Sequence, residues 1–262
     1  MRRDGAGLYH PDDISQRDPG LVADCLPWLE RLDRTYFRLT ASGHDNLPQG
    51  PALLVANHNG GILGPDLLCT LPVLWRHLGP SFPLFAMAHD FAMVQVRPLG
   101  RFLQGWGALR ASRRNARRVL EAGGQVLVYP GGDLEAYRHF SHRHRVRILP
   151  RSGFVSVARE MGVPIVPIVV RGAHQSAVIF HEGERLARLL GLVRWGRVRR
   201  FPLALALPWG LAVGPYLPYL PLPWSLRLSI LSPIYAESEA SDSEVATNVQ
   251  ARMQTALEGL AE

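Results

Sequence analysis

The chain has 262 residues, 47% of them hydrophobic, which is enough to bury one sizeable core. Its 29 basic residues are all arginine and exceed the 22 acidic ones, giving a formal net charge of +7. This composition excludes a long disordered chain, and the basic balance suits a phosphorylated ligand, an anionic membrane surface or nucleic acid. Nucleic acid is not predicted, because no reading motif or interleaved aromatic pattern accompanies the charge.

Residues 1–35 are predicted to form an N-terminal polar segment followed by an interrupted amphipathic helix over 21–35. The first thirteen residues contain no apolar core, so no signal peptide is expected there. Residues 36–262 are expected to form one further domain. Cys25 and Cys69 have neither metal nor redox spacing and are interpreted as buried, reduced thiols.

Beyond residue 35, short apolar runs alternate with helical patterns. Strands are predicted at 36–43, 51–57, 82–88, 125–130 and 163–170. Helices are predicted at 65–78, 112–124 (with Ser112 as N-cap) and 153–162, while 102–111 mixes a helix end with a strand. This alternation predicts an α/β fold, a single domain with a mixed, mostly parallel sheet flanked by helices.

Residues 201–226 carry no charge and are long enough to cross a bilayer, but six prolines forbid a regular helix there. The segment is therefore not predicted to span a membrane. One interpretation is an apolar hairpin that dips into a membrane interface. The other is a proline-rich strand pair that packs on the core of the protein itself.

The stretch VANHNGGILGPD, residues 55–66, ends an apolar strand at His58 and presents Asp66 after several glycines. Open α/β sheets place their chemistry at the carboxyl ends of strands. If the glycines let the chain double back, Asp66 orients the imidazole of His58, which then acts as a general base. The N–H groups of Gly60 and Gly61 are candidate donors to an oxyanion. The alternative is an ordinary loop histidine.

A second buried strand ends in Pro130, Gly131 and Gly132, within VLVYPGGDLEA at 126–136. Residues without side chains at a strand tip allow a ligand or a neighbouring backbone to approach closely. Glu135 follows and is a candidate to pair with an arginine or to accept a hydrogen bond from a hydroxyl. The pattern is neither a Walker loop, since no lysine follows, nor a dinucleotide-binding fingerprint.

Arginines gather in two places. Arg113, Arg114, Arg117 and Arg118 begin the helix predicted at 112–124, where they oppose its dipole. They either bind an anionic partner or form a solvated face.

The basic stretch YRHFSHRHRVR, residues 137–147, is either a rim facing lipid headgroups or CoA phosphates, or a solvated loop. Its histidines fit no common zinc spacing, so no metal is predicted for His139, His142 and His144. The other histidines of this half, His174 and His181, are interpreted as ordinary loop histidines.

Four blocks occur in order: NH…D from 57 to 66, GALRASR from 107, YPGG from 129 and VPIVPIVV from 163. In this order and at these separations they resemble the glycerolipid acyltransferase family, which includes the lysophospholipid acyltransferases. The PGGxxEA form is most similar to its diacylglycerol-acyltransferase-like branch. The resemblance covers roughly 36–235, identifies 36–262 as an acyltransferase domain, and implies a glycerol-3-phosphate acyltransferase-like fold.

By this resemblance, His58 matches the catalytic histidine of the family and Asp66 its aspartate partner. Substrate-binding positions are expected at Asn57, Gly60, Gly61, Arg113, Pro130, Gly131, Gly132 and Glu135. The family transfers a fatty acyl group from a CoA or carrier-protein thioester to a lipid hydroxyl, without a metal, another cofactor or an acyl-enzyme.

The sequence departs from the family pattern at two points. Seven residues separate His58 from Asp66, where the family usually has four. In the third block, Gly131 and Leu134 replace the glutamate and the arginine that commonly hold the phosphate of the acceptor. This favours a more neutral acceptor, such as a diglyceride, a long-chain alcohol or a larger lipid.

The sequence therefore predicts a peripheral O-acyltransferase at the cytoplasmic face of an anionic membrane. Acyl-CoA or acyl carrier protein is the expected donor, and a lysolipid, diglyceride or other lipid alcohol the acceptor. Phe85, Phe91 and Met93 either line an acyl channel or pack in the core. The alternative functions are a lipid or thioester hydrolase, for which no Gly-x-Ser-x-Gly elbow is present, and a non-catalytic lipid-binding protein on the same fold.

Overall fold

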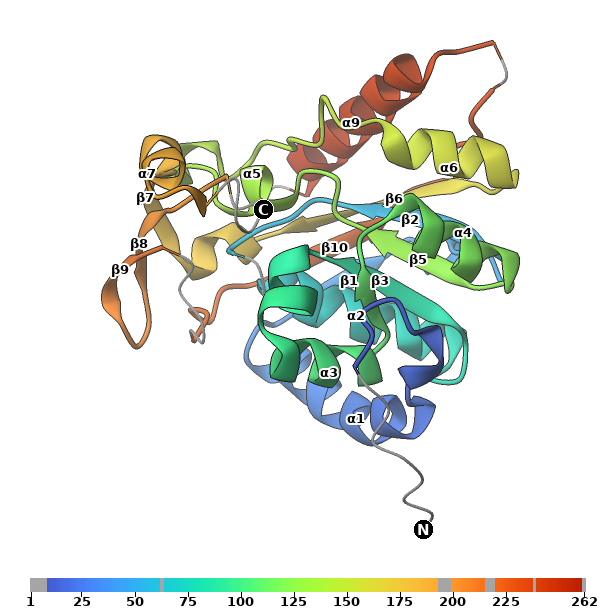
Figure 1. Cartoon of the computed structure of the whole chain (residues 1–262), viewed down its shortest axis with the longest axis horizontal. Coiled ribbons are helices and arrows are strands. Elements are labelled where there is room, and N and C mark those ends of the chain that lie inside the picture. The colour runs from blue at the N-terminus through green and yellow to red at the C-terminus, as the bar shows by residue number, and fades with distance from the viewer. Residues whose placement is uncertain (1–8, 62–63, 193–198, 215–219, 238, 261–262) are drawn as a thin grey trace.

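The computed structural model describes residues 9–61, 64–192, 199–214, 220–237 and 239–260. In this part of the chain a seven-stranded sheet has the order β1-β10-β6-β2-β5-β3-β4, with helices on both faces (Figure 1). Its strands are β1 (Thr40–Ser42), β2 (Ala52–Ala56), β3 (Leu84–Ala88), β4 (Ala108–Arg110), β5 (Gln125–Val128), β6 (Ile165–Arg171) and β10 (Arg227–Ile230). Only β10 and β6 pair antiparallel among the neighbours in this sheet. The predicted mixed, mostly parallel α/β sheet is confirmed.

Two helical layers enclose this sheet. One layer contains α1 (Pro19–Thr35), α2 (Pro65–Leu78) and α3 (Arg97–Gly105), and the other contains α4 (Arg113–Glu121), α6 (Gly153–Met161) and α9 (Asp242–Gly259) (Figure 1). Two short helices, α5 (Gly132–Ala136) and α7 (Glu184–Leu189), lie beyond the carboxyl ends of the central parallel strands.

Strand β2 contributes side chains to the hydrophobic cores on both faces of the sheet. All its residues are buried, as expected for a central parallel strand. Leu53 and Val55 belong to the core cluster that includes residues of α4, α6 and α9, whereas Leu54 and Ala56 belong to the cluster with α2. Successive side chains of a strand point to opposite faces, so an uninterrupted apolar run fills two cores.

Most predicted elements lie where the sequence placed them, and Ser112 caps α4 by accepting a hydrogen bond from the Asn115 N–H. Two differ. Helix α1 runs without a break through Pro27. The strand predicted at 36–43 shrinks to β1, because Phe37 N–H still bonds to Leu32 O at the helix end and Arg38 adopts a left-handed φ of 44°.

The sequence predicts two buried thiols and a domain boundary after residue 35. Both cysteines are free, and Cys69 is buried whereas Cys25 is only partly buried. Helix α1 packs against α2, and its Val22 lies in the core. The division of the chain at residue 36 stays a prediction.

The proline-rich segment forms part of a second sheet, ordered β7-β8-β9. Its strands are β7 (Val178–His181), β8 (Leu203–Ala206) and β9 (Gly210–Val213), and β8 and β9 form an antiparallel hairpin. Ala204, Ala206 and Ala212 face inward and pack with Tyr137 and Ile179, while the larger apolar side chains face outward. The inner face of the hairpin therefore packs on the core of the protein as the second interpretation expects, while insertion of the segment into a membrane interface stays a prediction. Residues 215–219 lie outside the described part.

No helix in the described ranges combines the length and apolar character that crossing a bilayer requires.

Asp33 of α1 is a buried acidic residue, and its ionisation tests how α1 packs against the core. Its carboxylate is buried, and Oδ1 has no hydrogen-bond partner among the described residues. Burial, and then the nearby Glu30 carboxylate, raise the pKa of Asp33 from 3.8 to about 7. Between these values the native state holds a proton that the unfolded chain has lost, so stability falls as the pH rises through this window.

We therefore expect Asp33→Asn to leave the free energy of unfolding nearly unchanged near pH 4 and to raise it by roughly 2 kcal/mol near pH 8. Urea unfolding at both pH values measures this. Asp24→Asn, at an exposed position of the same helix, is the control and should show no such pH-dependent gain. Equal gains for Asp33→Asn at both pH values would contradict the assignment.

Candidate active site

His58 and Asp66 meet at the carboxyl edge of the sheet. His58 is the second residue after β2, and Asp66 is the second residue of α2. His58 Nδ1 lies 2.8 Å from Asp66 Oδ2, and Asp66 is completely buried. The His58 side chain is 11% exposed, so part of the imidazole reaches the surface. The structure thus brings the two residues together despite their long separation in sequence.

Glycines make this approach possible. Gly60 and Gly61 have φ values of 75° and 105°, which favour glycine because other residues are strained there. A Cβ on Gly64 would lie 1.9 Å from Asn59 O and 2.4 Å from Asp66 Oδ1. The loop therefore folds back tightly enough to return the chain to His58, and a larger residue at position 64 would push it open.

The surroundings of His58 favour its charged form. Burial by itself lowers the pKa of His58, but the Asp66 carboxylate, and behind it Glu135, outweigh burial and raise the pKa above its ordinary value of 6.5. Asp66 Oδ2 also accepts a hydrogen bond from the Asn59 N–H at 3.0 Å. Held in this way, the carboxylate binds Nδ1–H of the imidazole and leaves Nε2 as the basic nitrogen. No group in the described residues hydrogen-bonds to Nε2.

Glu135 anchors the backbone of the loop that carries His58. Its Oε2 accepts a hydrogen bond from the His58 N–H at 2.9 Å, and its Oε1 accepts one from the Arg147 N–H at 2.8 Å. Burial raises the pKa of Glu135, and the nearby Arg138 guanidinium opposes that rise. Both carboxylate oxygens are thus engaged by backbone groups from different segments.

Arg138 is buried, although it belongs to the stretch 137–147 that was predicted to form either a basic rim or a solvated loop. Its guanidinium donates to His58 O and Glu135 O, each at 2.8 Å, to His142 O at 2.9 Å and to Arg143 O at 3.1 Å. It also donates to Asn59 Oδ1. Backbone carbonyl oxygens from three segments therefore accept hydrogen bonds from one guanidinium group. In this way Arg138 fixes the loop that carries His58.

His174 is likewise part of the site and not an ordinary loop histidine. It is buried in the 3-10 helix η5 (Ala173–Ser176), which follows β6. Its Nδ1 accepts a hydrogen bond from the Gly60 N–H at 3.2 Å, so Nε2 donates to Arg138 O at 2.9 Å. Burial, and then the charge of Arg138, lower its pKa well below the ordinary value. His174 is therefore neutral and holds the glycine loop in place.

Several sequence-predicted contacts with substrate are engaged within the protein. Asn57 is buried, and its side chain accepts from Val170 N at 2.8 Å and donates to Val170 O at 3.0 Å. The N–H of Gly60 binds His174, and that of Gly61 binds Ala136 O at 3.1 Å. In this conformation Asn57 joins β2 to β6, and neither glycine N–H points freely toward an oxyanion.

The Pro130-Gly131-Gly132 turn lies beside this network. A Cβ on Gly131 would lie 2.3 Å from Glu135 Oε2, which is the oxygen that binds the His58 N–H. The Gly132 N–H bonds to Tyr129 O, whereas the part of the chain described offers no acceptor for the Gly131 N–H. The Tyr129 ring packs against the His58 imidazole, with centroids 4.7 Å apart.

The arginines of α4 divide into two groups. Arg117 pairs with Glu160, and Arg118 donates to Asp12 O at 2.9 Å, so both are used within the protein. Arg113 and Arg114 are exposed. Arg113 lies beside Gly153, whose Cβ would be 3.1 Å from the guanidinium, and it begins its helix at the same sheet edge as His58.

Three further predictions concern side chains near the site. Phe85 and Met93 are buried in the core, and the side chain of Phe91 lies outside the described part. Of the basic stretch at 137–147, Tyr137 and Arg138 are buried. No described group of three or more His, Cys, Asp or Glu side chains has an arrangement that would hold a metal.

Replacing Arg138 tests whether this cation organises the site. We expect Arg138→Met to lower the free energy of unfolding by about 3–5 kcal/mol, because several buried oxygens lose their donor and Glu135 loses its nearest compensating charge. Arg147→Met is the matched control: its side chain is half-exposed and lies 3.9 Å from Glu182, so it should cost about 1 kcal/mol or less. Urea denaturation measures both, and equal losses would contradict the role of Arg138.

Comparisons with known proteins identify relatives of this chain. The acyltransferase family model matches residues 38–171, about half of the chain. An uncharacterized protein of Mycobacterium tuberculosis is 29% identical over 250 residues, which are 94% of this chain and 66% of that protein. Human diacylglycerol O-acyltransferase 2 is 26% identical over 177 residues, which are 64% of this chain and 42% of the human protein. The chain thus spans less than two thirds of the length of these relatives.

Among solved structures, the fold is similar to that of the 1-acyl-sn-glycerophosphate (LPA) acyltransferase PlsC from Thermotoga maritima. The TM-score is 0.53 and the sequence identity 18%, over 90% of this chain and 79% of that one. Sequence and fold agree: the chain belongs to the glycerolipid acyltransferase family.

Proposed function

We propose that this protein transfers a fatty acyl group from an acyl thioester, acyl-CoA or acyl carrier protein, to the hydroxyl of a lipid alcohol. The observation that carries this proposal is the 2.8 Å contact between His58 Nδ1 and Asp66 Oδ2 at the carboxyl edge of a parallel sheet. Membership of the acyltransferase family supports the reaction class.

In the proposed reaction, His58 Nε2 takes the proton from the acceptor hydroxyl as its oxygen attacks the thioester carbonyl carbon. The tetrahedral intermediate then collapses, the carbon–sulfur bond breaks, and the thiolate leaves and receives the proton from the imidazolium. An ester and a free thiol result. Asp66 holds the imidazole in the productive tautomer and stabilises its positive charge while it carries the proton. The thioester is a co-substrate, and the scheme uses no further cofactor.

The intermediate carries an oxyanion that needs a hydrogen-bond donor. We assign this role to the Gly131 N–H, because it has no acceptor among the described residues and a Cβ on Gly131 would lie only 2.3 Å from the Glu135 oxygen that binds the His58 N–H. One such donor contributes about 3 kcal/mol to the stability of a transition state. Asn57, Gly60, Gly61 and Glu135 then act by positioning and not by touching the substrate.

The acceptor is proposed to be more neutral than a lysophosphatidic acid. Gly131 and Leu134 stand at the positions where the common family block carries a glutamate and a phosphate-binding arginine. Human diacylglycerol O-acyltransferase 2, which resembles this chain, is named for an acceptor without phosphate. Arg113 is exposed at the same edge and is the candidate to bind a phosphate of the donor.

We further propose that the protein works as a peripheral protein on the cytoplasmic face of a membrane. A lipid alcohol with long acyl chains resides in a bilayer, and the net charge of +7 favours an anionic surface.

Removing the proposed base tests the reaction directly. His58→Ala should abolish transfer from radiolabelled acyl-CoA to a panel of diglycerides, long-chain alcohols and lysolipids, while the circular dichroism spectrum stays native. His139→Ala, which removes a partly buried histidine outside the contact with Asp66, is the control and should keep turnover. Mass analysis of the products identifies the acceptor. Free fatty acid without any ester would favour hydrolysis, and retained transfer by His58→Ala would rule out the mechanism.

The pH dependence tests the role of Asp66. A base works only when it is unprotonated, so kcat/KM should rise with pH through the raised pKa of His58, with its midpoint above 6.5. Asp66→Asn removes the charge that raises this pKa, so the acidic limb should move to lower pH. The plateau should fall by about 10²–10⁴-fold because the imidazolium loses its stabilising partner. An acidic limb that stays in place would contradict the pairing.

A further inference from the structure

The outer face of the β8–β9 hairpin exposes large apolar side chains. We define the hairpin surface as Leu205, Leu207, Trp209, Leu211 and Val213, all of which are exposed; Leu211 is 64% and Trp209 53% accessible. Leu205 pairs directly with Leu211 across the strands, and Leu203 pairs with Val213. Side chains paired in this way form one continuous face. Contiguous apolar surface of this kind marks an interaction site.

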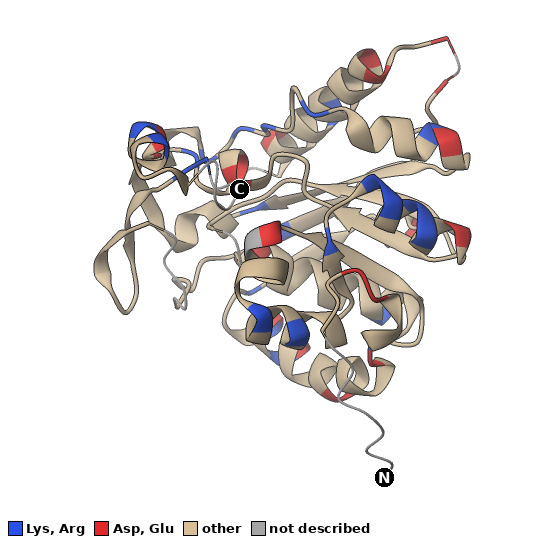
Figure 2. Cartoon of the chain, viewed as in Figure 1, with Lys and Arg blue, Asp and Glu red and all other residues tan. Residues whose placement is uncertain are grey.

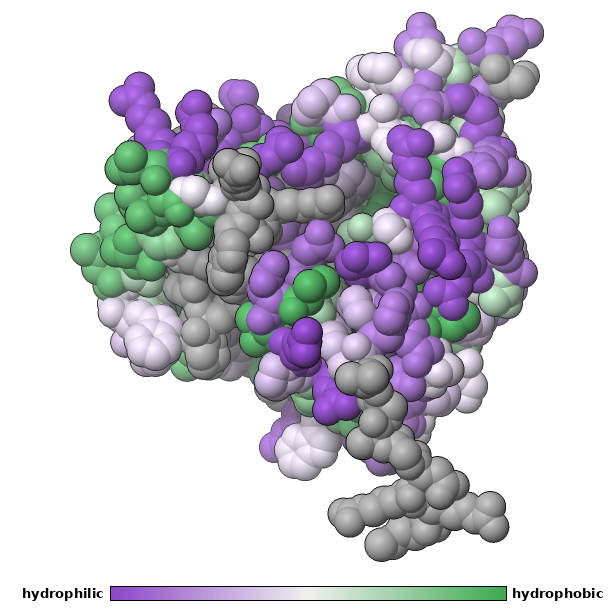
Figure 3. Space-filling model, in the orientation of Figure 1, coloured by the Kyte–Doolittle hydropathy of each residue, from purple (hydrophilic) through white to green (hydrophobic). Residues whose placement is uncertain are grey.

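Neighbouring segments extend the same apolar area. Helix α7 follows β7 in sequence and exposes Leu186 and Leu189, and Leu190, which caps the helix, is exposed as well. Leu220 is exposed and bonds through its N–H to Leu207 O, and Trp224 is exposed close by in sequence. In Figure 3 the hydrophobic colour gathers at the end of the molecule where Figure 1 places α7, β8 and β9.

We propose that the hairpin surface, together with the leucines of α7, docks onto a lipid bilayer with anionic headgroups. The charge distribution favours a bilayer over a protein partner. Residues 201–226 contain no charged residue, and Figure 2 shows the hairpin free of charge while arginines mark α7 beside it. An apolar face that carries tryptophan and is bordered by arginine matches the interfacial zone of a membrane.

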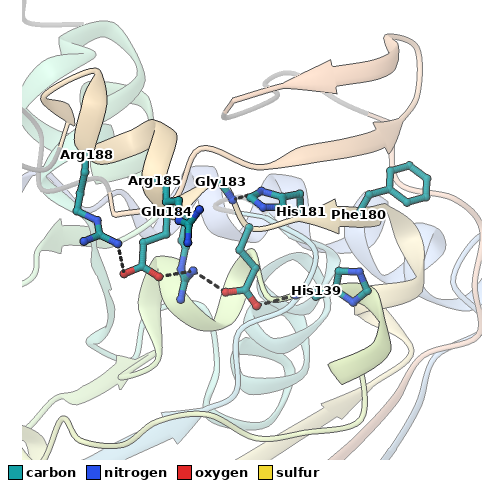
Figure 4. A pocket seen from close by; sticks show the side chains of 9 residues that line it. His139, Phe180, His181, Gly183, Glu184, Arg185 and Arg188 are labelled. Carbon is teal, nitrogen blue, oxygen red and sulfur yellow. Dashed lines mark hydrogen bonds and ion pairs between the residues drawn. The ribbon is translucent and has the colours of Figure 1, made fainter.

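Figure 4 shows how this border is built. Arg188 pairs with Glu184 at 3.6 Å, and the buried Arg200 pairs with Glu182 at 2.6 Å, so both carboxylates are already neutralised within the cluster. Arg185 is exposed and forms no ion pair with another described residue, so it adds a positive charge to this border. Phe180 points away from these charged groups. Anionic headgroups therefore meet arginine at the edge of the apolar area, without facing unpaired carboxylates.

The same geometry limits the depth of insertion. In the described part of the sheet β9 is an outer strand, so one row of its N–H and C=O groups lacks a neighbouring strand. Such groups cost several kcal/mol each in the hydrocarbon core, whereas headgroups and interfacial water satisfy them. The hairpin thus lies in the interface with its leucines and tryptophan toward the acyl chains.

This surface adjoins the proposed active site. Ala136 O accepts the Gly61 N–H of the His58 loop, and the next residue, Tyr137, packs with Ala204 and Ala212 on the inner face of the hairpin. Docking would hold the His58 edge beside the bilayer, so a lipid alcohol reaches it without leaving the membrane. This last step rests on the proposed acyl transfer; the docking itself does not, and it names the surface through which the proposed membrane association would occur.

Vesicle flotation with the full chain tests the proposal. We expect binding to phosphatidylcholine vesicles that contain phosphatidylglycerol, and weaker binding to pure phosphatidylcholine. Leu211→Gln combined with Val213→Gln should lower the partition coefficient by about tenfold or more, since two exposed apolar contacts are lost. These side chains point away from the core, so native circular dichroism is expected.

A tryptophan pair provides the matched comparison. Trp209→Gln should weaken binding, whereas Trp28→Gln, which removes a tryptophan that is 73% exposed on α1, should not. Equal losses for the two variants, or no vesicle binding by the parent protein, would overturn the proposal. A parent dimer that the Leu211 and Val213 changes convert to a monomer would also overturn it and assign the surface to a second copy.

Activity separates this proposal from the catalytic one. With a detergent-dispersed acceptor the hairpin variants should turn over like the parent, whereas with vesicle-embedded acceptor they should be slower. If no variant and no parent protein transfers acyl groups, the proposed reaction fails, but the flotation result still decides the docking surface.

Discussion

The arrangement of the site depends on one buried cation. The Arg138 guanidinium is removed from water and bonded to backbone oxygens of the His58 loop, of α5 and of the segment that follows α5. A buried charge is tolerated only where donors and acceptors are closely matched, so these segments can hardly shift relative to one another. Glu135 supplies the opposite charge and accepts a hydrogen bond from the His58 N–H. Through this pair the loop is fixed before any substrate arrives.

The pKa values of two buried histidines in this small region shift in opposite directions. His58 contacts Asp66, and the pKa of its imidazole rises despite burial. His174 contacts the Arg138 carbonyl, and burial together with the nearby guanidinium charge lowers its pKa. Burial lowers the pKa of both, and the sign of the nearest charge decides the outcome. One histidine is thereby suited to carry a proton, and the other stays neutral and supports the loop through Gly60.

In the proposed arrangement, the second sheet connects the His58 region with the membrane surface. Its inner face is built of alanines, which let β8 and β9 lie close to Tyr137 next to the site, and its outer face carries leucine, valine and tryptophan. A strand with apolar residues on both faces normally lies between two layers of protein. Here only the inner face is covered by described residues, which is why a bilayer is the proposed cover for the other.

The sequence by itself determined the α/β architecture, because fully apolar strands such as 52–56 alternate with capped helices such as α4, and both signals are local. It also singled out His58 and Asp66, through glycines and a family pattern. Only the tertiary structure decided that the glycine loop closes and that Asn57, Gly60 and Gly61 bond within the protein. It also showed Arg138 and His174 to be buried parts of the site. The reason is physical: their roles come from carbonyl and N–H groups of segments distant in sequence, and no local pattern of side chains records where those groups will lie.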